Sequence, residues 1–206
     1  MPARRRAPTV TNWARELQNY GSDGRLEVSA LAEILQKADR RLEEMWGYLR
    51  DVDATSAQNL RGFEAFLEVV YRLIKPSVPT GPSARVTVIE AANRTLTLID
   101  ATKTASRVLR RVAEAWQLSR RALEKATAYP GTDETLLSRV GANEDELTMR
   151  HYAVINSIDS LREQMRVTAG LFQEEAKRGS GTGRRSNSPT DKPDQRRHHQ
   201  PWNIAG

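Results

Sequence analysis

Apolar residues recur every three or four positions along four stretches of the chain, the spacing of a helix with one buried stripe. The first two stretches run from residue 31 to 49 and from 60 to 74, and Pro76 prevents the second from continuing, because proline lacks the N–H that a helix needs. The other two run from 101 to 123 and from 147 to 172. Four amphipathic helices predict an all-α domain that folds as an antiparallel four-helix bundle.

Two short runs between the second and third stretches show a different period. They are residues 85–89 (RVTVI) and 95–99 (TLTLI), which alternate between polar and apolar positions and are rich in β-branched residues. Such alternation is typical of strands. We therefore expect a small β element, a hairpin or a pair of strands, at one end of the bundle.

The net charge of +6 is concentrated at the two ends of the chain. Residues 1–8 carry three arginines and residues 177–206 carry seven basic residues against two acidic ones, whereas residues 9–176 carry 22 basic and 24 acidic residues. A nucleic acid would therefore meet local basic patches and arms, not a basic body. We expect a basic N-terminal arm (1–8), a folded domain (9–176) and a disordered basic C-terminal tail (177–206), which is poor in apolar residues.

The chain offers little for catalysis or metal binding. It has no cysteine, no P-loop, no glycine fingerprint and no metal-ligand spacing, and His151 is the single histidine of the predicted domain. His151 lies beside the apolar stripe of the fourth helix, where a structural role is the better expectation. Nowhere do about 18 apolar residues occur in succession, so no membrane span is expected. We expect a protein that is not an enzyme and needs no cofactor or metal.

A local basic patch lies along the third helix and continues beyond it. Arg120 and Arg121 stand near the C-terminal end of that helix, and Arg139 stands in an expected loop that follows Pro130 and Gly131. We expect the three guanidinium groups to converge at one end of the bundle. Bidentate hydrogen bonds to phosphates would then hold an RNA backbone without reading its sequence. Arginines that are merely solvated on a helix surface are the simpler interpretation of the same pattern.

Three adjacent acidic residues, Glu144, Asp145 and Glu146, precede the fourth helix. Acidic side chains at a helix start are favoured by the helix dipole and by capping, which is a better explanation than a metal site. A second interpretation stays open. Carboxylates that meet at a contact between subunits repel when ionised, which would make assembly sensitive to pH and calcium. Glu124, Glu144 and Glu146 are the candidates for that contact.

Several motifs occur in an order that carries information beyond each motif alone. They are residues 86–88 (VTV), 95–98 (TLTL), 115–124 (AWQLSRRALE), 130–136 (PGTDETL) and 155–158 (INSI). In this order and spacing the chain resembles the coat proteins of rod-shaped plant RNA viruses of the tobacco mosaic type. His151, Tyr152 and the segment 172–175 (FQEE) are more similar to the hordeivirus, pecluvirus and tobravirus branches.

The resemblance implies a coat subunit whose two pairs of helices point radially in a helical rod, with single-stranded viral RNA held between turns at the inner end. It places Arg121 on an RNA-contacting arginine of the family and Arg139 on or near another. Asp145 or Glu146 falls near an acidic residue beside the RNA.

The chain departs from the family pattern at two places. Ser119 stands where a second RNA-contacting arginine is expected, and Arg120 is the adjacent candidate, pointing about 100° away around the helix. The tobacco mosaic type also has a buried acid–arginine pair between the third and fourth helices. Gln117 and, approximately, Tyr152 stand in those places here, so that ion pair is not expected.

The expected partners follow from the resemblance. They are single-stranded genomic RNA and further copies of the chain in a helical assembly, in the virion and, during assembly, in the host cytoplasm. The basic tail is a candidate site for a vector-transmission factor, and no membrane partner is expected. The alternative is a helical adaptor of bacterial or phage origin that binds another protein. A coat subunit needs contact surfaces on both sides of the bundle, whereas an adaptor needs one.

Overall fold

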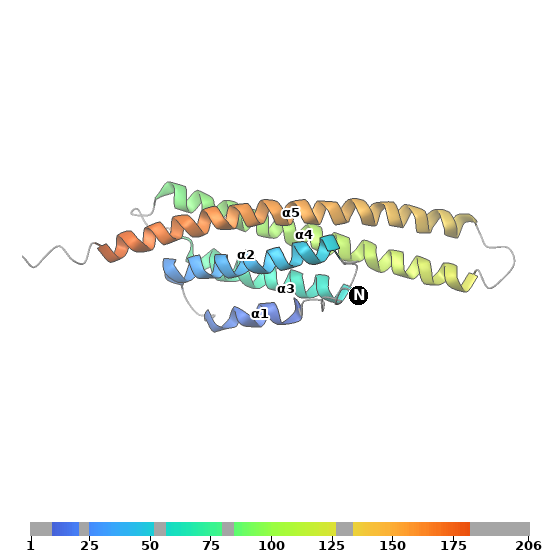
Figure 1. Ribbon diagram of the computed structural model, residues 1–206, viewed down its shortest axis with the longest axis horizontal. Coiled ribbons are helices and arrows are strands. Elements are labelled where there is room, and N and C mark those ends of the chain that lie inside the picture. Colours follow the sequence, from blue (N-terminus) through green and yellow to red (C-terminus); the bar gives the residue numbers. More distant parts are fainter. Residues whose placement is uncertain (1–9, 21–24, 52–56, 80–84, 127–133, 182–206) are drawn as a thin grey trace, which may run out of the picture.

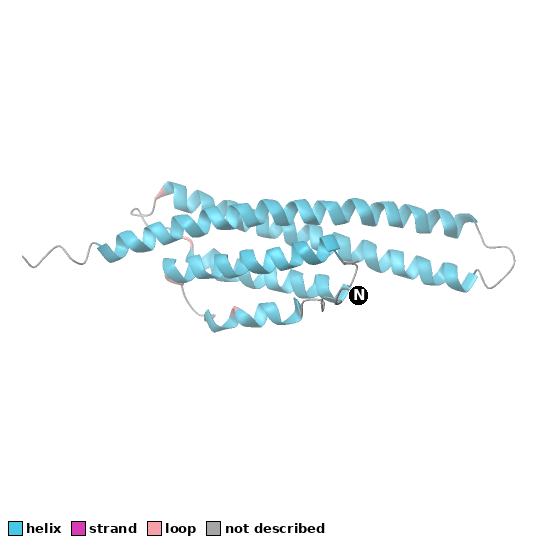
Figure 2. Ribbon diagram, viewed as in Figure 1, coloured by secondary structure: helices cyan, strands magenta, loops and turns pink. Residues whose placement is uncertain are grey.

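The protein is described by a computed structural model at residues 10–20, 25–51, 57–79, 85–126 and 134–181. All regular structure in these ranges is helical (Figure 2). A short N-terminal helix, which the apolar pattern did not predict, is flanked by single 3₁₀ turns. The helices are α1 (Trp13–Glu16), α2 (Val28–Asp51), α3 (Ala57–Ile74), α4 (Val86–Ala126) and α5 (Glu134–Gly181).

The two longest helices, α4 and α5, lie side by side and antiparallel (Figure 1). Hydrogen bonds set this alignment at both ends: the hydroxyls of Thr95 and Thr168 lie 2.9 Å apart, and Asn143 Nδ2 donates to Ser119 Oγ at 3.0 Å. Helix α2 packs on α5 and α3 packs on α4, while α1 lies against α3. The molecule is therefore elongated along the α4–α5 pair.

The predicted helices at 31–49 and 60–74 are confirmed as α2 and α3. Every apolar position of the α3 stripe is buried. Burying one large aliphatic or aromatic side chain stabilises the fold by about 1.5–3 kcal/mol, so this stripe suffices to hold α3 against its neighbours. Helix α3 ends at Ile74, before Pro76, and a 3₁₀ turn follows at Lys75–Ser77. There Ser77 Oγ accepts a hydrogen bond from the backbone N–H of Leu26 at 2.9 Å, which joins the start of α2 to the end of α3.

The predicted β element is wrong, because residues 86–99 form the first part of α4. Val88, Ala92, Thr95 and Ile99 are buried and recur at three or four positions, so the segment presents a helical stripe as well as an alternating one. Thr95 is accommodated in the helix interior because its hydroxyl bonds to the carbonyl of Ala91 at 2.9 Å. Packing against α5 overrides the β propensity of the residues.

Helix α5 is longer than expected at both ends. It begins at Glu134, so Arg139 and the acidic residues 144–146 lie inside a helix. Arg139 is therefore not in a loop, and the explanation of the acidic residues by helix capping is wrong. At the other end α5 continues to Gly181, so residues 177–181, expected to belong to the tail, are helical. The expected arm at 1–8 and residues 182–206 of the expected tail lie outside the described residues.

Candidate functional site

Helices α4 and α5 project beyond the ends of α2 and α3 (Figure 1). The last buried residue of α4 is Ala113 and the first of α5 is Leu147, so none of the described residues between them is buried. We call residues 117–126 and 134–146 the hairpin tip. The expected site residues Arg120, Arg121 and Glu124 lie on its α4 part. Its α5 part carries Arg139, Glu144, Asp145 and Glu146.

A single seam joins the two helices of the hairpin tip. Six half-buried residues spaced three or four apart make up this seam, three from each helix: Ser119, Leu123, Ala126, Leu136, Val140 and Asn143. The hydrogen bond from Asn143 to Ser119 lies at its inner end. Two helices with one seam and no buried core gain little from packing, so the hairpin tip depends on the α2–α5 body for its stability.

The arginines expected to bind RNA are exposed on the hairpin tip. Arg121 follows Ser119 by two residues and Arg139 precedes Asn143 by one helical turn, so the seam brings them to the same projecting end of the molecule. Neither makes an ion pair or a hydrogen bond within the described part of the chain. Arg120 is oriented differently: its guanidinium carbon lies 5.1 Å from the centroid of the Trp116 ring, a cation–π contact.

The candidate carboxylates lie on the same hairpin. Glu144 and Asp145 are exposed and make no ion pair with any described residue. Glu146 accepts a hydrogen bond from Arg150, one turn along α5, at 3.4 Å. Among the described residues, no group of three or more histidine or acidic side chains is placed to hold a metal ion.

Arg121, Arg139, Glu144 and Asp145, which make no ion pair within the described chain, contrast with the charges of the body. Between α3 and α4 and between α2 and α5, carboxylates and basic side chains form networks. These include Glu64 with Arg110 at 2.8 Å, Glu68 with Lys103 at 3.0 Å, Arg61 with Glu114 at 3.0 Å, and Asp39 with Arg162 at 3.1 Å and Arg166 at 2.9 Å. Hydrogen bonds from Lys103 and Arg72 lower the pKa of Glu68, and bonds to Asp100 and Glu68 raise the pKa of Lys103.

Helix length explains why Arg121 has no ion-pair partner on α3, the described helix that pairs with the preceding turns of α4. Lys103, Arg110 and Glu114 lie on one side of α4 and pair with residues of the antiparallel α3. Arg121 continues this face seven residues, or two turns, after Glu114. Helix α3, however, begins only at Ala57, so it offers no carboxylate opposite Arg121.

The same reasoning applies to Glu144 on α5. His151 Nε2 donates to the carbonyl oxygen of Leu49, near the end of α2, at 2.7 Å, which is a structural contact. Glu144 lies two turns before His151, beyond the point where α2 ends at Asp51. Tyr152, expected at a position of the family's buried ion pair, is 62% exposed.

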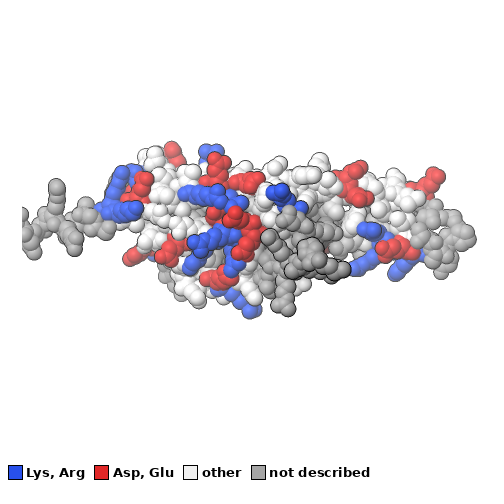
Figure 3. Space-filling view, in the orientation of Figure 1, with Lys and Arg blue, Asp and Glu red and all other residues white. Residues whose placement is uncertain are grey.

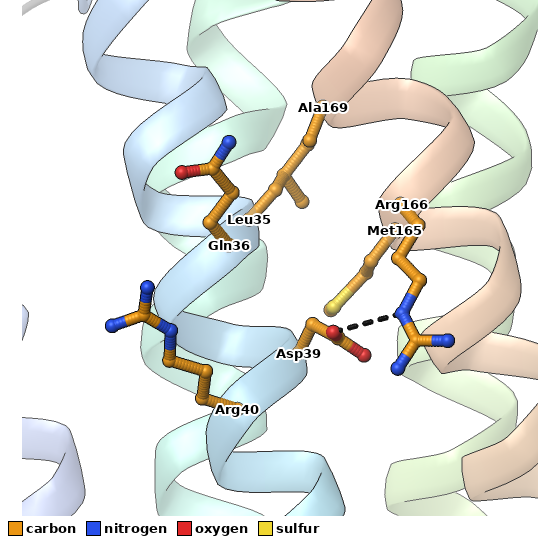
Figure 4. Close-up of a pocket in the computed structure, with 7 residues that line it drawn as sticks. All are labelled: Leu35, Gln36, Asp39, Arg40, Met165, Arg166 and Ala169. Carbon is orange, nitrogen blue, oxygen red and sulfur yellow. Dashed lines mark hydrogen bonds and ion pairs between the residues drawn. The ribbon is translucent and has the colours of Figure 1, made fainter.

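Hollows elsewhere on the described chain do not gather the arginines of the candidate site. Two of them, of about 580 Å³ between α3 and α4 and of about 420 Å³ between α2 and α5, are open to solvent and carry no arginine in their lining. The cavity of about 140 Å³ between α2 and α5 is lined partly by Leu35, Met165 and Ala169 and is crossed by the ion pair of Asp39 with Arg166 (Figure 4). A water molecule occupies about 30 Å³ of liquid volume, so this cavity has room for a few waters only. The hairpin tip is therefore the best candidate for an interaction site.

Comparisons with protein-family models, with curated proteins and with solved structures found no match to this chain. Within the described ranges, none of the helices combines the length and the apolar character that crossing a membrane requires. Sequence reasoning missed the exposed apolar residues Leu118 and Leu137 on the hairpin tip. The sequence feature that could have revealed them is their position: both leucines fall outside the stripe of apolar residues at three- and four-residue spacing.

Proposed function

We propose that the chain is a structural subunit that assembles with copies of itself around single-stranded RNA. This is the function of the coat proteins that it resembles, and the helices α2 to α5 would form their four-helix bundle. The observation that carries the proposal is the placement of Arg121 and Arg139. Both are exposed and unpaired within the described chain, at the end of the molecule that carries the hairpin tip.

The chemistry of the hairpin tip suits a phosphate backbone. A guanidinium group donates two parallel hydrogen bonds to a phosphate, a geometry that suits a nucleic-acid backbone. Such contacts do not depend on the base sequence, as packaging of a whole genome requires. Asp145 lies on the same projecting end, where its carboxylate would repel phosphate.

The first test is negative-stain electron microscopy of the purified protein near pH 5 and near pH 8, with and without RNA. Rods or stacked discs, favoured by acid or by RNA, are the expected result. Monomers or dimers under every condition would contradict the proposal and favour the adaptor, in which the hairpin tip binds a different protein.

The second test removes the arginines one at a time. Arg121→Ala, and to a smaller extent Arg139→Ala, should reduce the protection of RNA from nuclease while leaving the helical content unchanged in circular dichroism. The dependence of log affinity on log salt should become shallower by about 0.7 for each phosphate contact removed. Arg111→Ala is the matched control, because Arg111 is an exposed arginine of α4 outside the hairpin tip with no partner among the described residues. If both tip variants package RNA as the parent does, the RNA site lies elsewhere.

A further inference from the structure

The outer edges of the hairpin tip, which face away from the seam, are the least explained surface of the molecule. Four of the six large hydrophobic side chains that are exposed in the described chain lie on or next to the tip, each more than half exposed: Leu118, Leu137, Met149 and Tyr152. Exposed apolar side chains gathered on a segment without a core are typical of a surface that another protein covers.

Charge on the hairpin tip is separated between the two helices. The α4 part carries Arg120, Arg121 and Lys125 against Glu124, and the α5 part carries four acidic residues against Arg139. Figure 3 shows this separation at the right-hand end of the molecule: basic side chains gather over the lower helix, α4, and acidic side chains over the upper helix, α5.

Helical spacing places charge and apolar surface on the outer edges. On α4, Leu118, Arg121 and Lys125 follow one another at three and four residues; Arg121 lies opposite the seam, and Leu118 and Lys125 lie about 100–130° away from it around the helix. On α5, Glu134 and Asp145 are eleven residues, or about three turns, apart and also lie opposite the seam. Arg121, Lys125, Glu134 and Asp145 are all exposed, and none of them makes an ion pair within the described chain. The hairpin therefore presents a basic α4 edge and an acidic α5 edge that cannot reach each other across the seam.

We propose that the α4 edge of one copy packs against the α5 edge of the next copy. Leu118, Arg121 and Lys125 of one subunit would meet Glu134, Asp145 and Tyr152 of its neighbour. The partner is a second copy because one chain carries both complementary edges. The contact is heterologous, so each added copy leaves one basic and one acidic edge open and growth continues.

This inference rests on the self-assembly part of the proposed function and not on RNA binding. The edge contact is encoded in the protein, so it should act when RNA is absent. Salt screens exposed charges, so assembly should weaken as ionic strength rises from 0.05 to 0.5 M.

The test is charge reversal at each edge, read by sedimentation velocity of RNA-free protein. One variant carries Arg121→Glu with Lys125→Glu, and the other carries Glu134→Lys with Asp145→Lys. Each variant alone has two edges of like charge, so the concentration needed for assembly should rise about tenfold or more. An equimolar mixture of the two variants should bring the concentration needed for assembly back to within about threefold of the parent's. In the mixture each acidic variant can pack against a basic one, so the two alternate along the assembly. A misfolded variant would not be restored by mixing.

The control carries Arg94→Glu with Arg111→Glu, two exposed arginines of α4 outside the hairpin tip, and should assemble as the parent does. If both edge variants assemble like the parent, or if mixing fails to restore assembly, the edge contact is wrong while the coat function stands. A parent that assembles only on RNA also overturns the edge contact. A parent that assembles neither with nor without RNA overturns both proposals.

Discussion

The ion pairs of Asp39 give the sharpest prediction about how α2 is held on α5. Asp39 is a residue of α2 whose side chain is 16% exposed, and it joins two arginines of α5, Arg162 and Arg166; Figure 4 shows the contact with Arg166. Arg162 Nε donates to Oδ1 at 3.1 Å and Arg166 Nε donates to Oδ2 at 2.9 Å. We consider the substitution Asp39→Asn, which keeps the size of the side chain and removes its charge.

The two arginines differ in exposure, and this sets the magnitude. Arg166 is 59% exposed, so its ion pair contributes about 0–1 kcal/mol. Arg162 is 13% exposed, and a charge that loses its partner in such a place costs up to about 3–5 kcal/mol. Arg162 keeps an ion pair with Glu43, at 3.2 Å, which reduces the loss. We therefore expect Asp39→Asn to lower the free energy of unfolding by about 2–3 kcal/mol and Arg166→Ala by less than about 1 kcal/mol.

The assay is guanidinium unfolding followed by circular dichroism, at a protein concentration where the subunits stay apart. Arg40→Ala is the control, because Arg40 is exposed beside Asp39 and makes no ion pair within the described chain; its effect should stay within about 0.5 kcal/mol. If Asp39→Asn costs no more than Arg166→Ala, the reasoning from exposure is refuted and Arg162 does not depend on Asp39.

Two further predictions concern the contacts that α4 makes with α5 and with α3. Thr95→Val should lower the free energy of unfolding by about 1 kcal/mol, because Thr168 loses the hydroxyl group 2.9 Å away. The double variant with Thr168→Val should lose less than the sum of the two single losses. Additive losses in chemical denaturation would contradict this. Glu68→Gln should cost about 0.5–1 kcal/mol near neutral pH. Lys103 and Arg72 lower the pKa of Glu68 in the folded state. The ionised Glu68 side chain therefore stabilises the fold above the usual pKa of a glutamate, and this stabilisation is lost as the pH falls through the lower pKa of the folded state. The difference in unfolding free energy between the parent and Glu68→Gln should disappear in acid. A difference that persists in acid would mean that Glu68 acts through packing.

The local pattern of the sequence was sufficient for α2 and α3. Each carries one apolar stripe at helical spacing, and Pro76 sets the end of α3 through its own covalent structure. Such signals need no knowledge of the rest of the chain. The residue types of the candidate site, Arg120, Arg121 and Arg139, could also be read directly.

The start of α4 could not be decided locally, because residues 86–99 fit both an alternating and a helical stripe. In α4 the buried positions Thr102 and Ser106 are polar, so its stripe is weak in the sequence; Ser106 is tolerated because its hydroxyl donates to the carbonyl of Thr102 at 2.9 Å. Contact with α5 selects the helix. The first three turns of α5 were missed because residues 134–146 contain no fully buried side chain and so carry little apolar periodicity.

The sequence by itself determined that the chain is mainly helical, where α2 and α3 lie, and which arginines and carboxylates are available. The tertiary structure alone decided which of those charges are paired. Arg110 has a partner and Arg121 has none within the described chain, although both lie on the same side of α4. The difference arises because α3 runs antiparallel beside α4 and starts at Ala57, too late to lie opposite Arg121. Pairing depends on the lengths and alignment of helices distant in sequence, and no local pattern encodes these.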